Sequence, residues 1–230
     1  QYGSREKNLS DITGSTLTAG VNYNTEINKK LNGFASLTFS TDSKLSSTNS
    51  RNIGTIQYSS SGAEILVQSL EVDVDNTNIT LPSKFSFGFG LGQTKKWMLG
   101  TEITFQKSSN MGNRFNDINN VNFENSLRYS LGGFYIPNYN SFSKYYEKII
   151  YRAGLRYENT GLIINKTAIK EYAATAGLGL PLIGVFSNIN IGMEYGQRGT
   201  TSANLVQENY TNITIGLSLN DKWFQKRRYY

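Results

Sequence analysis

The segment Thr211-Asn-Ile-Thr-Ile-Gly-Leu-Ser-Leu219 alternates strictly between two kinds of residue. Its odd positions carry Thr, Ile, Ile, Leu and Leu, whereas its even positions carry Asn, Thr, Gly and Ser. Because neighbouring side chains of a β-strand point to opposite faces, this spacing predicts a strand with one apolar face and one face of small or polar residues.

The same alternation recurs along the chain and predicts about eleven strands, mostly of roughly 9–13 residues. The clearest are 17–24, 85–92, 97–106, 127–132, 151–157, 171–180 and 189–196, with weaker patterns at 53–58 and 65–74. Segment 31–39 is less regular, because Phe34 falls on the polar face. Strands of this length suit a tilted crossing of a bilayer, whereas strands of soluble proteins average only about 5–6 residues.

The composition agrees with a membrane β-barrel. The chain contains 15 Tyr, 12 Phe and 22 Gly but only 3 Pro, and its mean hydropathy is -0.41. Such barrels keep a low mean hydropathy because lipid-facing and lumen-facing residues alternate. No run approaches the ~18 apolar residues of a transmembrane helix.

The residue types also exclude several functions. The chain has no Cys and no His, so thiolate and imidazole chemistry is absent, and we expect no enzyme, cofactor or metal site. The net charge is +6, but the basic residues are dispersed except at Lys226-Arg227-Arg228, which argues against nucleic-acid binding.

A soluble β-sandwich would alternate too, but two features favour the membrane. The polar face is rich in Gly, Ser, Thr and Asn rather than in Lys and Glu, which suits a confined lumen. Aromatic residues lie near the ends of the apolar faces, where a membrane-interface girdle forms. The interface aromatics that we predict are Trp97, Tyr151, Tyr157, Tyr195, Trp223 and Phe224. We therefore expect an all-β, antiparallel transmembrane β-barrel in the outer membrane of a Gram-negative bacterium.

Charged residues of both signs fall on the predicted lumen face. They are Glu102, Glu124, Arg128, Arg152, Arg156, Glu171, Glu194 and Arg198. One interpretation is a ladder of ion pairs that fills and stiffens the interior, because buried charges must be paired. The other is a polar channel that sets selectivity.

Several C-terminal motifs resemble the FadL-like outer-membrane proteins. They are Tyr151-Arg-Ala-Gly-Leu-Arg-Tyr-Glu, Ala176-Gly-Leu-Gly-Leu-Pro-Leu, Met193-Glu-Tyr-Gly-Gln-Arg-Gly-Thr and Ile215-Gly-Leu-Ser-Leu-Asn-Asp-Lys-Trp-Phe-Gln-Lys-Arg. The resemblance covers roughly residues 80–230 and implies a 14-stranded barrel with an N-terminal hatch that takes up hydrophobic molecules. It further implies that residues 1–230 form a single barrel domain that is the C-terminal part of that barrel, without the hatch and the first strands.

Two functions remain open at this stage. The first is the uptake of hydrophobic small molecules, which the resemblance implies. The second is a non-enzymatic subunit or adaptor of a larger outer-membrane complex for protein secretion or assembly. We expect outer-membrane lipid as a partner, together with hydrophobic small molecules in the first case or other complex proteins in the second.

Two segments add to these alternatives. The aromatic-rich segment 135–146 is either a partner-binding surface or a self-packed loop. The aromatic and basic tail 220–230 either lies at the membrane interface or is solvated.

Overall fold

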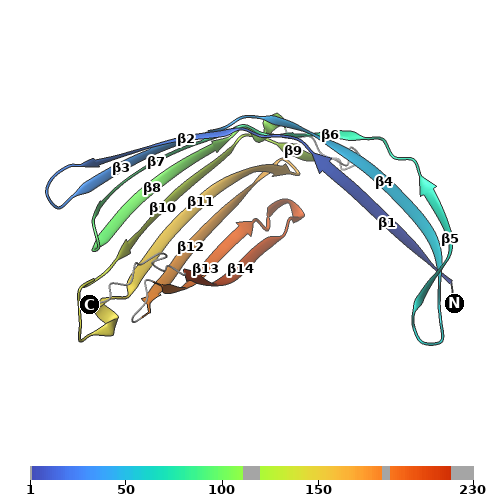
Figure 1. Cartoon of the computed structure of the whole chain (residues 1–230). Helices are drawn as coiled ribbons and strands as arrows, with labels where there is room; N and C mark the ends of the chain where they lie inside the picture. Colours follow the sequence, from blue (N-terminus) through green and yellow to red (C-terminus); the bar gives the residue numbers. More distant parts are fainter. Residues whose placement is uncertain (1, 111–119, 183–186, 219–230) are drawn as a thin grey trace, which may run out of the picture.

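The computed structural model of the chain describes residues 2–110, 120–182 and 187–218, and almost all of its regular structure is antiparallel β-sheet (Figure 1). Its helical segments are single 3-10 turns at Ser108–Asn110, Tyr145–Glu147 and Ser202–Asn204. None of the helices in this part of the chain is long and apolar enough to cross a membrane. The predicted all-β, antiparallel class is confirmed.

Most strands belong to one curved sheet, which we call the main sheet. Among the described residues, nine strands pair in the order β14-β13-β12-β11-β10-β8-β7-β3-β2, and the short β9 (Val121–Phe123) pairs with β11. Their bounds are β2 (Thr18–Glu26), β3 (Asn32–Ser40), β7 (Lys84–Gln93), β8 (Trp97–Gln106), β10 (Ser126–Tyr135), β11 (Ile150–Ile164), β12 (Thr167–Pro181), β13 (Asn188–Gly199) and β14 (Gln207–Ser218).

The remaining strands form a second sheet, which we call the arm. It contains β1 (Tyr2–Thr13), β4 (Ser43–Tyr58), β5 (Glu64–Val72) and β6 (Thr77–Leu81). Strand β4 lies in the middle, with β1 on one side and both β5 and β6 on the other. Figure 1 shows the arm projecting beyond one end of the main sheet as a single layer.

The arm is a continuation of the strands at one margin of the main sheet. Strand β1 leads into β2, β3 leads into β4, and β5 and β6 lead into β7. The pairings agree, because β2, β3 and β7 are neighbours in the main sheet just as β1, β4 and β5 are neighbours in the arm. Strand β4 alone has 16 residues, which is about 50 Å of extended chain.

The connections divide between the two ends of the main sheet. At the arm end lie the connections from β8 to β9, from β11 to β12 and from β13 to β14. At the opposite end, the far end, lie the turns at 27–31 and 94–96 and the connections 136–149 and 182–187. The far end therefore combines two short turns with the long connection 136–149.

The predicted strand count needs correction. The structure has fourteen strands over its described residues, and β1, β6 and β9 were not predicted. Two predicted segments, 53–58 and 65–74, belong to the arm rather than to the barrel wall. The nine paired strands of the main sheet do not close on themselves within the described residues, since β2 pairs only with β3 and β14 only with β13.

Candidate functional site

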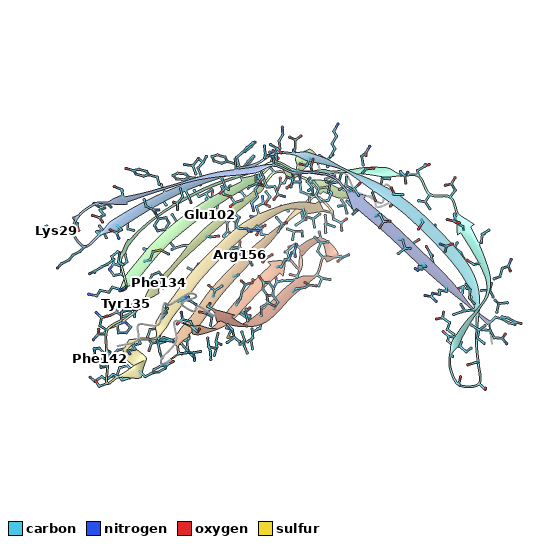
Figure 2. All side chains as sticks on the ribbon, in the orientation of Figure 1. Lys29, Glu102, Phe134, Tyr135, Phe142 and Arg156 are labelled. Carbon is cyan, nitrogen blue, oxygen red and sulfur yellow. The ribbon has the colours of Figure 1, made fainter. Side chains whose placement is uncertain are left out.

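The two faces of the main sheet differ in burial as well as in chemistry. Along β7, Phe87 is 42% exposed and its neighbour Ser86 is only 8% exposed. Side chains converge on the concave side of a curved sheet, so the buried, small and polar set marks the inner face. One hollow of about 490 Å³ on this face is lined by residues from β3 through to β13. Figure 2 shows Glu102 and Arg156 on the ribbon of this sheet.

Phe34, which breaks the predicted alternation, lies over glycines of the inner face. A Cβ atom at Gly90 would stand 2.4 Å from Cζ of Phe34, and one at Gly100 would stand 3.2 Å from it. A bulky ring therefore fits on a face of small residues because the neighbouring strands leave space for it.

Arg156 is the centre of an ion-pair network on the inner face. Its Nη2 atom lies 2.7 Å from Oε1 of Glu171 on β12 and 3.3 Å from Oε1 of Glu194 on β13. The same nitrogen donates a hydrogen bond to the hydroxyl of Tyr210 on β14 at 3.0 Å. Four neighbouring strands are thus joined through one guanidinium group.

The network extends in both directions from Arg156. On β10, Arg128 makes a bidentate contact with Glu158, at 2.8 Å from Nε to Oε2 and 3.2 Å from Nη2 to Oε1. On β13, Arg198 places Nε at 3.7 Å from Oε2 of Glu171. Glu158 and Glu171 are 14% and 11% exposed, so these carboxylates are largely removed from solvent and are stabilised by paired charges.

Tyr210 closes the network at the edge strand. Its ring lies over Gly196, where a Cβ atom would stand 2.3 Å from the ring. Its hydroxyl donates to Oε1 of Glu171 at 2.6 Å. A glycine on β13 therefore lets a tyrosine of β14 reach a carboxylate of β12.

The structure brings five of the eight predicted inner-face charges into this network, namely Arg128, Arg156, Glu171, Glu194 and Arg198. The other three have separate polar contacts. Glu102 accepts a hydrogen bond from Thr104 at 3.1 Å, Glu124 accepts one from Asn159 at 3.0 Å, and Arg152 donates to Asn190 at 2.8 Å.

Sequence reasoning missed Glu158 and Tyr210. Both stand at positions that continue the inner face of β11 and β14, so alternation alone could have placed them. Nothing in the sequence showed that Tyr210 would reach across two strands, because that contact depends on the register that places Gly196 opposite it.

The outer face of the main sheet carries aromatic residues in two rows. The upper row consists of Tyr129, Tyr157 and Tyr172, which are direct cross-strand partners with ring centroids 6.2 Å and 5.1 Å apart. The lower row consists of Trp97, Tyr135 and Tyr151, which are also direct partners.

The outer face between these rows is apolar. The rows are six residues apart along β10 and β11, or about 20 Å. Phe85, Phe105 and Leu127 are cross-strand partners that extend the apolar face one step past the upper row, to about 26 Å. Most of its larger side chains are exposed, including Leu131, Leu155, Ile191, Met193, Ile213 and Ile215.

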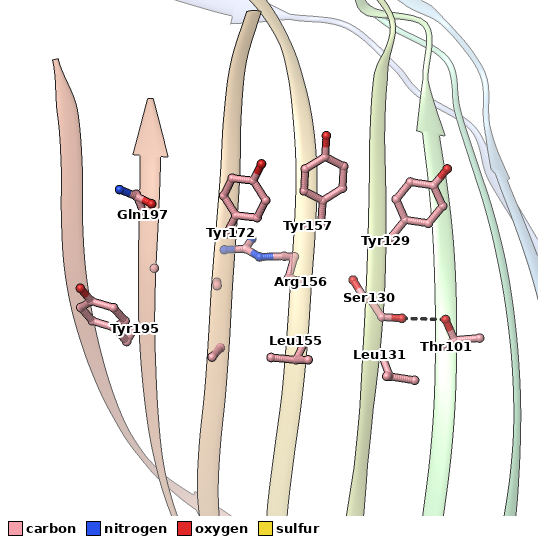
Figure 3. Close-up of a pocket in the computed structure, with 13 residues that line it drawn as sticks. Thr101, Tyr129, Ser130, Leu131, Leu155, Arg156, Tyr157, Tyr172, Tyr195 and Gln197 are labelled. Atoms are coloured by element: carbon pink, nitrogen blue, oxygen red, sulfur yellow. Dashed lines mark hydrogen bonds between the residues drawn. The ribbon is translucent and has the colours of Figure 1, made fainter. Parts of the chain in front are cut away.

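A shallow groove of about 570 Å³ runs below the upper row (Figure 3). Figure 3 shows Leu131 and Leu155 beneath Tyr129 and Tyr157, with Tyr195 on β13, beyond the strand of Tyr172. The groove exists because Ala174 stands between Leu155 and Tyr195 in the cross-strand row and leaves a depression.

Four of the predicted interface aromatics fall on this outer face. Trp97 and Tyr151 belong to the lower row and Tyr157 to the upper row, and Tyr195 is paired with Ala174, one step below Tyr172. Trp223 and Phe224, with the tail 220–230, lie outside the described residues.

The connection 136–149 is packed in part against its surroundings. Its tyrosines contact neighbouring segments: Tyr139 lies under Nζ of Lys95 at 4.8 Å, and Tyr145 donates to the carbonyl of Pro181 at 3.1 Å. Phe142, by contrast, is fully exposed.

The arm exposes large apolar side chains at its tip. Tyr2, Tyr58, Ile65, Leu66 and Val67 gather near the β4–β5 turn, and each is at least half exposed. We call this set the tip cluster. Since the arm is a single layer there, no described element covers these residues.

The described part of the chain contains no group of three or more His, Cys, Asp or Glu side chains placed to hold a metal ion. Five of the eight predicted charges of the inner face belong to an ion-pair network, which suits a structural role.

Comparison with known proteins favours one of the two open functions. No curated protein matches the chain. The BamG family model, however, matches residues 1–230. BamG is a BAM complex-associated outer-membrane protein, so the match supports an outer-membrane β-protein and the complex-subunit alternative, and it gives no support to a FadL-like identity or to hydrophobic transport. Because the match covers the whole chain, the chain belongs to the BamG family.

Proposed function

We propose that the chain is a non-enzymatic subunit of an outer-membrane protein-assembly complex, with its main sheet in the membrane and its arm outside it. The family match is the observation that carries the proposal, because a BamG protein is described as BAM complex-associated.

The outer face of the main sheet supports its placement in the bilayer. Outer-membrane barrels carry an apolar band about 25 Å tall between two aromatic girdles. The aromatic rows of the outer face are about 20 Å apart, and its apolar surface continues past the upper row to about 26 Å in all. In water, so many exposed Leu, Ile, Met and Phe side chains on one face would be an aggregation hazard.

The inner face argues for a structural role rather than for transport of apolar molecules. It is crossed by the Arg156 network from β10 to β14, in which the carboxylates of Glu158, Glu171 and Glu194 are bound to arginines. An apolar molecule moving along this face would have to displace paired charges, and leaving them unpaired is costly.

The tip cluster supplies a contact surface for a protein partner. Protein interfaces are enriched in Tyr and large apolar residues at their centres, and the tip cluster offers both on β1 and on the β4–β5 hairpin. We expect this surface to bind another subunit of the complex.

Affinity purification of the full protein from native outer membrane in mild detergent tests the proposal. We expect assembly-complex proteins in stoichiometric amounts, and we expect Val67→Asp in the tip cluster to reduce their recovery at least tenfold. Val206→Asp is the control, because Val206 is an exposed valine of the β13–β14 connection. Recovery of the protein alone with a stoichiometric apolar ligand would instead identify a transporter.

A further inference from the structure

The main sheet has two free edges, and in a bilayer both need partners. Strand β2 pairs only with β3, and β14 pairs only with β13, over the described residues. Each edge therefore presents a row of backbone N–H and C=O groups. Lipid offers no hydrogen bonds to these groups, so an open sheet edge does not persist within the hydrocarbon region.

The two edges cannot complete an antiparallel wall with each other. All neighbouring pairs in the main sheet are antiparallel. Nine alternating strands make the first and the last run in the same direction, so β2 and β14 both run from the arm end to the far end. Joining them would introduce one parallel pair. Bacterial single-chain barrels have even strand numbers, which avoid this.

A second copy of the chain does not supply an antiparallel partner for either edge. A copy inserted in the same orientation presents its own β2 and β14 running in the same direction as the first. Each junction between copies would again be parallel. The strand that fits either edge must run from the far end to the arm end.

The β2 edge is the less protected of the two. All nine residues of β2 are exposed, and the strand contains no proline and a single charged residue, Glu26, at its last position. Charges, prolines and bulges are the usual means of keeping an edge unpaired. Strand β14 likewise has no proline and a single charged residue, Glu208, but its side chains are tied to the rest of the sheet through Tyr210 and through a bond from Asn190 to Ser218.

The β2 edge also continues beyond the membrane. Strand β1 is the outer strand of the arm on the same side, since among the described residues it pairs only with β4. Residues 2–26 therefore form one free margin of roughly 80 Å, of which only a part lies in the main sheet.

We propose that the β1–β2 edge receives an antiparallel β-strand from a partner outer-membrane β-barrel protein. That strand runs opposite to β2, turns apolar residues outward beside Ala19, Val21 and Tyr23, and turns small polar residues inward beside Gly20 and Asn22. The inference rests on the proposed function, because it assigns the membrane contact of the same complex.

Site-specific photocrosslinking in native outer membrane tests this assignment. A benzophenone side chain is placed at Ala19, Val21 or Tyr23 in the full protein, and the adducts are sequenced by mass spectrometry. Ala153, an outward residue inside the main sheet, is the control. We expect edge adducts with one partner protein, whose crosslinked residue moves two positions toward its N-terminus when the probe moves from Ala19 to Val21.

Other outcomes overturn the inference. Adducts with β14 that advance in the same direction as the probe would show parallel closure. Adducts with any other segment of the same polypeptide would show that no partner strand is used, and so would edge adducts no more abundant than those of Ala153. In each of these cases the copurified subunits of the preceding experiment would still establish the proposed function.

Discussion

The arm and the neighbouring margin of the main sheet are built from the same three lengths of chain, yet their side chains follow different patterns. Strand β3 turns Ala35, Leu37 and Phe39 to the outer face, whereas β4 begins with Ser43-Lys-Leu-Ser-Ser-Thr-Asn-Ser-Arg-Asn52. Hydrogen bonding is equally regular in both, so backbone pairing does not explain the difference. If the main sheet lies in the bilayer and the arm in water, as we propose, the surroundings of the side chains change near Thr41, and the largest expected differences between mutants follow from that change.

Leucine-to-arginine substitutions at two equally exposed positions give the largest expected contrast. Leu155 on the outer face is 61% exposed and Leu70 in the arm is 63% exposed. We expect Leu155→Arg to lower the free energy of unfolding by about 2–4 kcal/mol, because it places a charge in the bilayer. We expect Leu70→Arg to change it by less than ~0.5 kcal/mol. Urea unfolding in lipid vesicles measures both, and equal losses would contradict the membrane placement of the main sheet.

Removal of an arginine should also lower the free energy of unfolding more in the main sheet than in the arm. Arg156→Met leaves Glu194 without its guanidinium partner and leaves Glu171 with only the longer guanidinium contact, that of Arg198, and it should cost about 2 kcal/mol. Arg51→Met in the arm breaks a solvent-exposed pair with Glu6 at 2.9 Å and should cost less than ~1 kcal/mol. The same unfolding assay applies, and a loss at Arg51 as large as that at Arg156 would mean that the inner network does not stabilise the sheet.

Two glycines of the main sheet test the packing of Tyr210. In Gly196→Ala, the new Cβ would stand 2.3 Å from the Tyr210 ring, so the ring must move and we expect a loss of about 1–2 kcal/mol. In the control Gly216→Ala, no atom lies within 4 Å of the new Cβ, and we expect no loss. If both variants unfold at the same urea concentration, Tyr210 does not lie over Gly196.

Acid should loosen the arm slightly before it affects the main sheet. The pKa of Glu6 is lowered by a hydrogen bond from Asn8 and by the charge of Arg51. A lowered folded-state pKa stabilises the fold above the ordinary carboxyl pKa, and this contribution is lost as the pH falls through the lowered value. We expect amide hydrogen exchange of β1 to quicken relative to β12 as pH is lowered from 6 to about 3, and Glu6→Gln to remove that dependence. A pH dependence that persists in Glu6→Gln would assign it to another group.

Alternation predicted the strands of the main sheet because each of its faces meets a different environment. It did not predict β1, with the sequence Tyr2-Gly-Ser-Arg-Glu-Lys-Asn-Leu-Ser-Asp-Ile-Thr13, because nearly all residues of that strand are exposed on both of its faces and neither face needs to be apolar. Alternation also did not predict the register between neighbouring strands. The contacts of Phe34 with Gly90 and of Tyr210 with Gly196 depend on which residues stand opposite one another. Alternation predicted which charged residues lie on the inner face, but it did not predict which residues they contact.

The resemblance of short motifs to FadL-like proteins gave weaker evidence of function than the family match. Short motifs around Tyr151 and Met193 resemble FadL-like proteins, yet they lie on strands whose pattern of apolar and small residues is required of outer-membrane barrels in general. The family match over residues 1–230 carries more information than these motifs, because it also covers the arm.

Spin labels on single introduced cysteines can test whether the main sheet lies in the bilayer and the arm in water, since the chain has no native Cys. Labels are placed at Ile191 on the outer face, at Thr175 on the inner face and at Leu70 in the arm, and collisions with oxygen and with a water-soluble nickel chelate are measured in lipid vesicles. If the main sheet lies in the bilayer, we expect high oxygen and low nickel accessibility at Ile191 and the reverse at Leu70. We also expect a lower oxygen accessibility at Thr175 than at Ile191. Equal nickel accessibility at Ile191 and Leu70 would contradict this placement, because the main sheet would then stand in water like the arm.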